Sequence, residues 1–163
     1  MSTEELEEKR LERLRQVGIL DSPDSSLFSK IAEQALELLP GTSIAAISLV
    51  DAERQWFKTI VGLDVKETPR AFSFCSHTIK MHGGTMVVED ATKDERFAKN
   101  PLVTGSPGIR FYAGVKLMDG IGALCVIGKH PRRASDVEIA KLTKLSQYAD
   151  IQLMAHGTRF NLR

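Results

Sequence analysis

The feature that most constrains the fold is a short turn between two runs of strand-forming residues. Asp119 and Gly120 separate residues 109–117 from residues 121–127, and both runs are rich in apolar and β-branched side chains. An Asp-Gly pair favours the two-residue type I′ turn, because both central residues of that turn have positive φ angles. The sequence therefore predicts an antiparallel hairpin, and with it a sheet that is at least partly antiparallel.

A second hairpin is predicted earlier in the chain. Residues 44–50 and 55–61 are both β-rich, and the short polar segment 51–54 separates them. Such a short connection joins antiparallel neighbours, because parallel strands need a long crossover. Residues 85–89 are predicted as a further strand, and short helices are expected at residues 73–80 and 93–98.

Helices are predicted at both ends of the chain. Ser2 with Glu5, and Ser135 with Glu138, have the spacing of a capping box. The first helix is expected to end at Gly18, and the last to run to about residue 154.

The order of these elements indicates an α+β fold. A further helix at residues 28–39 precedes the first hairpin, so two hairpins lie within a frame of helices, which favours an antiparallel sheet covered by helices over a doubly wound parallel sheet. A length of 163 residues with 42% apolar content provides one core. We therefore expect a single domain, with an N-terminal helix in residues 1–17, a sheet core and pocket in 18–133 and a C-terminal helix in 134–157.

Composition excludes several classes of protein. Lys and Arg number 22 against 21 Asp and Glu, so no basic field for nucleic-acid binding is present. The longest apolar runs, residues 44–50 and 123–127, are too short to span a bilayer, and the N-terminal residues are acidic rather than signal-like. Cys75 and Cys125 lack metal-ligand spacing, and the four histidines are scattered. We expect a cytoplasmic protein without a metal, a cofactor or a membrane partner.

A series of short motifs follows in unbroken order between about residues 14 and 153. They read Gly18-Ile19-Leu20-Asp21, Ile47-Ser48-Leu49-Val50-Asp51, Arg54-Gln55-Trp56-Phe57-Lys58, Gly62-Leu63-Asp64, Glu67-Thr68-Pro69-Arg70, Ser73-Phe74-Cys75-Ser76-His77, Asp94-Glu95-Arg96-Phe97-Ala98-Lys99-Asn100-Pro101-Leu102-Val103, Ile109-Arg110-Phe111-Tyr112-Ala113-Gly114 and Leu124-Cys125-Val126-Ile127. Together they resemble a subfamily of GAF domains found ahead of diguanylate cyclase or histidine kinase modules in bacterial signalling proteins. The resemblance implies a six-stranded antiparallel sheet, a pocket on one face and terminal helices that pair in dimers.

The sequence departs from this family pattern in two places. The hairpin at Asp119 and Gly120 is shorter than usual, and Gly128 stands where an Asp commonly follows the preceding strand. The sequence also reaches Arg163 without a catalytic output module. We therefore expect a stand-alone domain whose signal leaves through contact with another chain, unless the sequence is part of a longer protein.

The resemblance also implies which side chains form the pocket. The expected ligand-binding residues are Trp56, Phe72, Phe74, Cys75, His77, Asp90, Arg96, Phe97, Arg110 and Tyr112. Of these, the six expected around one concavity on the sheet are Phe72, Cys75, His77, Asp90, Arg110 and Tyr112. Aromatic walls with a few convergent polar groups are typical of a ligand pocket, but the same aromatic side chains also fill the core of a domain of this size.

Two interpretations of the charged residues remain open. Arg110 either binds a carboxylate or phosphate through its planar guanidinium, or forms an internal salt bridge with Asp90 or Asp94. Asp90, Asp94, Glu95 and Arg96 either line the mouth of the pocket or form a solvated turn.

Cys75 raises the question of thiol chemistry. His77 lies two residues further on, where helical geometry turns the two side chains about 200° apart, so they do not form a nucleophilic pair by themselves. A buried small thiol is the common role of a free cysteine. Free methionine-R-sulfoxide reductases also use the GAF fold, and a similar enzyme here would require Cys75 to meet Cys125. Bilin-binding GAF domains carry a cysteine in the segment corresponding to residues 101–108, which has none here.

The leading hypothesis is therefore a bacterial sensor module that binds a small molecule or a partner protein and is not itself an enzyme. A thiol-dependent pocket enzyme and a structural dimerisation unit with a collapsed pocket are the alternatives. We expect a homodimer through the apolar stripes of the terminal helices, or contact with a separate signalling protein. If the first helix instead folds back on the last within one chain, it satisfies both stripes.

Overall fold

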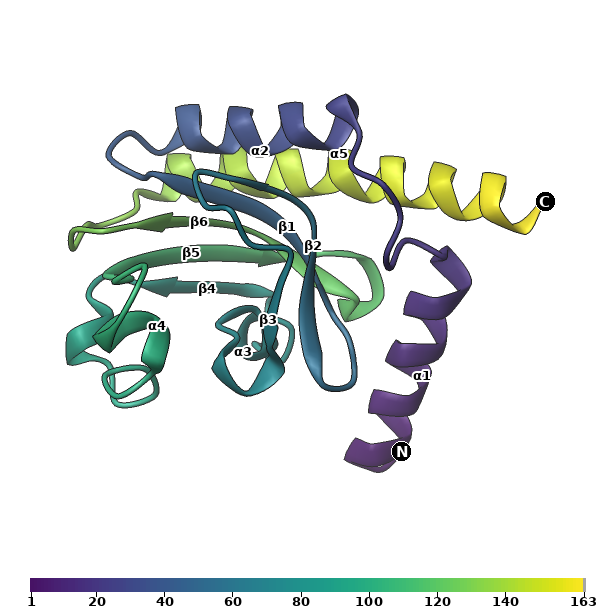
Figure 1. Cartoon of the computed structure of the whole chain (residues 1–163), viewed down its shortest axis with the longest axis horizontal. Helices are drawn as coiled ribbons and strands as arrows, with labels where there is room; N and C mark the ends of the chain where they lie inside the picture. Colours follow the sequence, from purple (N-terminus) through teal and green to yellow (C-terminus); the bar gives the residue numbers. More distant parts are fainter. Residues whose placement is uncertain (163) are drawn as a thin grey trace.

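A six-stranded antiparallel sheet organises the computed structural model, which describes residues 1–162 (Figure 1). The strands are β1 (Ile44–Val50), β2 (Arg54–Val61), β3 (Glu67–Pro69), β4 (Thr85–Val88), β5 (Phe111–Lys116) and β6 (Gly122–Gly128). Their order across the sheet is β3-β2-β1-β6-β5-β4, and every neighbouring pair is antiparallel. The predicted α+β class is confirmed.

The turn between β5 and β6 has the predicted conformation. Asp119 and Gly120 have φ angles of 55° and 66°, and the Ile121 amide donates to the Met118 carbonyl over 3.1 Å. Both central residues thus have the positive φ that the Asp-Gly pair indicated. The segment Met118–Gly120, labelled η3, is this turn and not a helix, because Asp119 has a non-helical φ angle.

Three long helices and several short ones surround the sheet. They are α1 (Thr3–Val17), α2 (Ser26–Leu38), η1 (Arg70–Phe72), α3 (Cys75–Thr78), η2 (Ala91–Lys93), α4 (Pro101–Thr104) and α5 (Asp136–Asn161). Both predicted capping boxes are present, from Ser2 with Glu5 and from Ser135 with Glu138. None of the helices in residues 1–162 is long and apolar enough to cross a membrane.

The last helix is longer than predicted, ending at Asn161 rather than near residue 154. Gly157 interrupts the helical sequence pattern without ending the helix. A Cβ at this position would lie 3.5 Å from the Val17 Cα, an ordinary van der Waals distance, so this part of α5 packs directly against the end of α1. Tertiary contact thus overrides the low helix propensity of glycine.

The sheet separates two layers that differ in kind. Figure 1 shows α2 and α5 side by side along one face, and α3 and α4 with their loops along the other. Side chains alternate between these layers, so that Phe111 and Ala113 of β5 belong to the core under the helices while Tyr112 belongs to the core under the loops. We call these the helix face and the loop face.

α1 links the two layers at one end of the sheet. Its C-terminal end contacts α5, where His156 Nε2 lies 3.1 Å from the Gly18 carbonyl oxygen. Its N-terminal half diverges from α5 (Figure 1), and there Arg10 donates to the carbonyl oxygens of Val50 and Gly120 over 2.6 and 3.2 Å. The terminal helices therefore pack together at their C-terminal ends, while strand ends hold the rest of α1.

Candidate functional site

An aromatic cluster lies at the centre of the loop face. Phe74, directly before α3, stacks on Phe97 with ring centroids 3.9 Å apart and planes inclined by 10°. Its ring also lies 5.2 Å from that of Tyr112 on β5. All three side chains are buried, as is Cys75 at the start of α3. Four of the predicted site residues are thus brought together in one core.

The hydroxyl of Tyr112 is placed inside this core by an adjacent glycine. It lies 2.7 Å from Thr78 Oγ1 and 3.1 Å from Cys75 Sγ. A Cβ on Gly114 would overlap this hydroxyl, so only glycine leaves room for it. Burial, the largest cause, raises the pKa of Tyr112 well above its usual value.

The two cysteines line one cavity together with Tyr112. Cys125 lies in β6 between its register partners Ala46 and Gly114, and both thiols are buried. The hydrogen bond with Cys75, together with burial, raises the pKa of Cys125 well above its ordinary value. The structure therefore brings Cys75 and Cys125 to one cavity, the proximity that sequence analysis required for a thiol pair.

Cys75 is the thiol whose ionised form is better stabilised. Burial opposes its ionisation, but the neighbouring polar groups of Cys125, Ser48 and Tyr112 lower the pKa of Cys75 below its ordinary value. His77 does not take part, as the i to i+2 spacing predicted. Its imidazole is exposed and meets the edge of the Phe97 ring, with centroids 4.9 Å apart.

A small cavity of about 40 Å³ lies against both thiols and the Tyr112 ring. The other lining residues are Ile44, Gln55, Phe57, Ile60, Leu63, Val65, Thr68, Phe74, Leu102, Pro107, Ile109 and Ile127. One water needs roughly 10–15 Å³ of such volume, so the cavity has room for a few atoms and not for a nucleotide or a tetrapyrrole. A larger ligand would have to displace the loops that cover it.

A buried polar chain extends from one side of the cavity. Gln55 Oε1 accepts hydrogen bonds from Ser48 Oγ at 3.3 Å and from Ser73 Oγ at 2.5 Å, and its Nε2 donates to Thr68 Oγ1 at 3.2 Å. Sequence analysis did not single out Gln55 or Phe57 as pocket residues. Gln55 and Phe57 lie on either side of Trp56 in β2. Because alternate residues of a strand share a face, this spacing indicates that the two side chains point to the same layer.

Trp56 is the clearest correction to the predicted site. It packs in the core of the helix face, opposite Leu49 of β1, and does not line the cavity. Phe57 occupies the pocket side instead. A register irregularity between Ile47 and Ser48 sets which residues of β2 face which layer, and the sequence pattern did not reveal it.

Arg110 and Asp90 have local structural partners. Arg110 Nη1 donates to the carbonyl oxygens of Val103 at 2.9 Å and Ile109 at 3.0 Å, which satisfies the C-terminal end of α4. No ion pair joins it to Asp90 or Asp94 within residues 1–162. Asp90 caps η2 by accepting from the amide and hydroxyl of Thr92. Both lie outside the central cavity, so the predicted single concavity is not formed.

Arg96 and Phe72 lie at the periphery. The Arg96 guanidinium is 5.0 Å from the Phe97 ring centroid and pairs with Asp94 at 2.7 Å. Phe72 is half-buried, and its carbonyl accepts a hydrogen bond from Asn100 Nδ2 at 3.1 Å. The cation at this rim is thus already neutralised by a neighbouring carboxylate.

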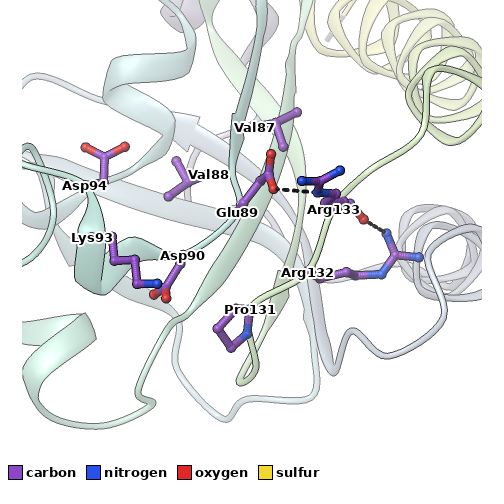
Figure 2. Close-up of a pocket in the computed structure, with 9 residues that line it drawn as sticks. All are labelled: Val87, Val88, Glu89, Asp90, Lys93, Asp94, Pro131, Arg132 and Arg133. Atoms are coloured by element: carbon purple, nitrogen blue, oxygen red, sulfur yellow. Dashed lines mark hydrogen bonds and ion pairs between the residues drawn. The ribbon is translucent and has the colours of Figure 1, made fainter.

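An open hollow of about 590 Å³ lies where β4 ends, opposite the segment leading into α5 (Figure 2). Val87, Val88, Glu89, Asp90, Lys93, Asp94, Pro131, Arg132 and Arg133 line it. Several of its ionic groups have partners: Glu89 pairs with Arg133 at 3.6 Å, and Arg132 pairs with Glu138 at 2.6 Å. Within residues 1–162, no group of three or more His, Cys, Asp and Glu side chains is arranged to hold a metal ion.

The chain has the GAF fold. It superposes on the GAF domain of an Acinetobacter phosphoenolpyruvate-protein phosphotransferase with a TM-score of 0.63 and 22% identity, covering 98% of this chain and 97% of that one. The GAF domain of Thermosynechococcus elongatus PixJ, in its blue-light-absorbing form, also gives 0.63, at 14% identity and 91% and 90% coverage. Free methionine-R-sulfoxide reductase from Neisseria meningitidis, in complex with its substrate, gives 0.61 at 19% identity, covering 98% and 95%. The same fold thus occurs both in the GAF domains of signalling proteins and in reductases.

A curated protein shares more sequence. Over 130 residues the chain is 42% identical to the cyclic di-GMP phosphodiesterase PA2567 of Pseudomonas aeruginosa. The match covers 77% of this chain and 22% of the relative, so the chain spans about a fifth of that protein. No protein-family model matches the chain.

These comparisons correct the prediction that the chain is not an enzyme. The relative at 42% identity is named as a phosphodiesterase, and several structures with the same fold are named as reductases. The prediction rested on the lack of a catalytic output module in this sequence. That lack does not show whether the domain belongs to an enzyme.

Proposed function

We propose that this domain is a regulatory module in bacterial cyclic di-GMP turnover and controls the activity of a phosphodiesterase in response to a small molecule or protein partner. The observation that carries the proposal is the 42% identity over 130 residues with a cyclic di-GMP phosphodiesterase. The sensory fold and the buried polar core around Tyr112 support it, because polar groups held in a rigid apolar site can report a change of occupancy.

A chimera tests this function. In it, the matching residues of this chain replace the corresponding segment of the Pseudomonas aeruginosa enzyme, and cyclic di-GMP hydrolysis is followed by chromatography. We expect the chimera to be active, and its rate to change several-fold when Tyr112→Phe removes the buried hydroxyl. The matched control is Ser26→Ala, which removes an exposed hydroxyl at the start of α2 on the helix face. Equal rates for the chimera, both variants and an enzyme lacking the segment would contradict regulation. Hydrolysis by the isolated chain would instead place catalysis within the domain.

We also propose a homodimer formed mainly through α5. Six exposed apolar side chains follow this helix and its C-cap: Val137, Tyr148, Ile151, Met154, Phe160 and Leu162. By contrast, Leu14 and Val17 of α1 are buried within the chain. The apolar stripe of α1 is therefore largely buried within the chain, and the apolar surface available to a second copy lies on α5.

Sedimentation equilibrium at micromolar concentration tests the dimer. We expect Ile151→Glu to produce monomers, because it places a charge in the apolar stripe, whereas Gln16→Glu, at an exposed position of α1, leaves the dimer intact. A monomeric wild-type protein would refute the proposal. Leu14→Glu is unsuitable as a test, because this residue has no exposed surface and its replacement would unfold the chain.

A further inference from the structure

Cys75 and Cys125 come from separate elements and share one buried environment. Cys75 begins α3, Cys125 lies within β6, and α3 packs directly on β5 and β6. Each side chain is 2% exposed, and both border the cavity on the loop face. Two buried thiols that line one cavity form a pair, unlike the isolated structural thiols common in protein cores.

Hydroxyl groups around Cys75 are arranged to stabilise its thiolate. Tyr112 is 3.1 Å from the sulfur, and Thr78 Oγ1 is 2.7 Å from the same phenolic oxygen. Because hydroxyl hydrogens rotate, Thr78 can donate to Tyr112 while Tyr112 donates to the sulfur. The space for this phenol exists because position 114 is glycine. The hydroxyl chain thus favours a negative charge on Cys75.

The cavity selects the kind of molecule that can reach the thiols. Its volume of about 40 Å³ and its mainly apolar lining admit a small neutral molecule and exclude an ion or a nucleotide. Hydrogen peroxide is little larger than water and carries no charge. It therefore fits the existing space without displacement of the covering loops.

We propose that Cys75 and Cys125 form a redox site that hydrogen peroxide, or a small alkyl hydroperoxide, oxidises to an intramolecular disulfide. The Cys75 thiolate attacks one peroxide oxygen, so that an S–O bond forms and the O–O bond breaks. The departing oxygen takes up the proton released by the Cys75 thiol and leaves as water or an alcohol.

Cys125 then resolves the sulfenic acid. Its sulfur attacks the Cys75 sulfur, an S–S bond forms, the S–O bond breaks, and hydroxide leaves as water with the Cys125 proton. In sum, two thiols and one hydroperoxide give one disulfide, one alcohol or water, and one further water. The two electrons lost by the sulfur atoms reduce the peroxide, and a thioredoxin-type dithiol returns the site to its reduced form.

The disulfide would join α3 covalently to β6. If the domain regulates a phosphodiesterase, as proposed above, this oxidation would be the signal to which it responds. Arg70 in η1 lies five residues before Cys75 and pairs with Glu7 of α1 at 2.6 Å. A shift of α3 is therefore transmitted over a short stretch of chain to the contact that holds α1.

Peptide mapping of the full chain tests the redox site. Reduced native protein is treated with an equimolar amount of hydrogen peroxide, alkylated and digested without a reductant. We expect the peptides of Cys75 and Cys125 to be joined, with a loss of two hydrogen atoms from the intact mass that dithiothreitol reverses. Sulfinic acid on separate cysteines, an unmodified protein, or a disulfide that forms only after unfolding in urea would overturn the proposal.

Single variants assign the two roles. In Cys125→Ser we expect a sulfenic acid on Cys75 that dimedone traps, and in Cys75→Ser at least tenfold less adduct on Cys125. Tyr112→Phe, which keeps the ring, should slow disulfide formation about tenfold by removing a hydrogen bond to the thiolate. Equal trapping in both serine variants would overturn the assignment of Cys75 as the attacking thiol. If circular dichroism shows that a variant is unfolded, the wild-type peptide map alone decides the proposal.

The two proposals can fail separately. A disulfide that forms in the chimera without changing cyclic di-GMP hydrolysis would refute the regulatory input and leave the redox site standing. A chimera whose rate responds to Tyr112→Phe but forms no disulfide would refute the redox site alone.

Discussion

The two faces of the sheet are filled by different kinds of side chain. The helix face is packed mainly with aliphatic residues from β1, β5, β6, α2 and α5. The loop face holds a stacked aromatic pair, two thiols, a phenol and a chain of hydroxyl and amide groups. This difference indicates that the helix face contributes most of the free energy of folding. The loop face has less apolar packing and instead contains groups that can react or bind.

Adjacent residues of β6 offer the strongest test of this comparison. Leu124 faces the helices and Cys125 faces the loops, and both are buried. We expect Leu124→Ala to lower the free energy of unfolding by about 3 kcal/mol through lost burial and a residual cavity. Cys125→Ala should cost about 1 kcal/mol, because it removes a single sulfur atom. Urea denaturation measures both, and similar losses would show that the two faces contribute equally.

A smaller effect is expected at Gly114. An added methyl group would overlap the Tyr112 hydroxyl, so Gly114→Ala should destabilise the protein by about 2 kcal/mol. The double variant with Tyr112→Phe removes the overlapping oxygen and should recover part of this loss. Additive losses in thermal denaturation would show that the phenol can move aside, and that the loop face is less tightly packed than proposed.

The smallest effect concerns the ion pairs that join α1 to the loop layer. Hydrogen bonds and charge from Arg10 and Arg70 lower the pKa of Glu7 from 4.5 to about 2. A carboxylate with a depressed pKa stabilises the fold above its unfolded-state value, and this contribution is lost as pH falls from about 4.5 towards 2. Because Glu7 is partly exposed, we expect about 1 kcal/mol after solvent screening.

Glu7→Gln isolates this contribution. The variant should be less stable than wild type at pH 7, and the difference should narrow as pH falls through that window. Glu8→Gln, an exposed neighbour on the same helix, is the control. If both variants keep the wild-type pH dependence in urea titrations from pH 2 to 7, the ion pairs at Glu7 do not secure α1.

Local signals allowed most of the fold to be predicted. Capping boxes at Ser2 and Ser135 and the Asp119-Gly120 turn depend on neighbouring residues, so short sequence patterns reveal them. β3 was missed because it has three residues, Glu67–Pro69, and pairs with β2 through long-range contacts. The end of α5 was missed because a contact with Val17, distant in sequence, accommodates Gly157.

The site was harder to predict because it depends on which face each side chain occupies. Phe74, Phe97 and Tyr112 gather as expected, but a register irregularity in β1 and β2 sets Trp56 on the opposite face. The proximity of Cys75 to Cys125 depends on how α3 packs against the sheet. Sequence analysis named that encounter as a condition for thiol chemistry, but no periodicity in the chain could show that it occurs.

The unequal lengths of the two helices on the helix face have a mechanical consequence. α5 has 26 residues and α2 has 13, so α5 is about 39 Å long and extends well beyond its companion (Figure 1). The overhanging part meets α1 at Gly157 and His156. A force on the C-terminal end of α5 would therefore act on α1 through this contact, and Arg10 would pass it on to the strand ends.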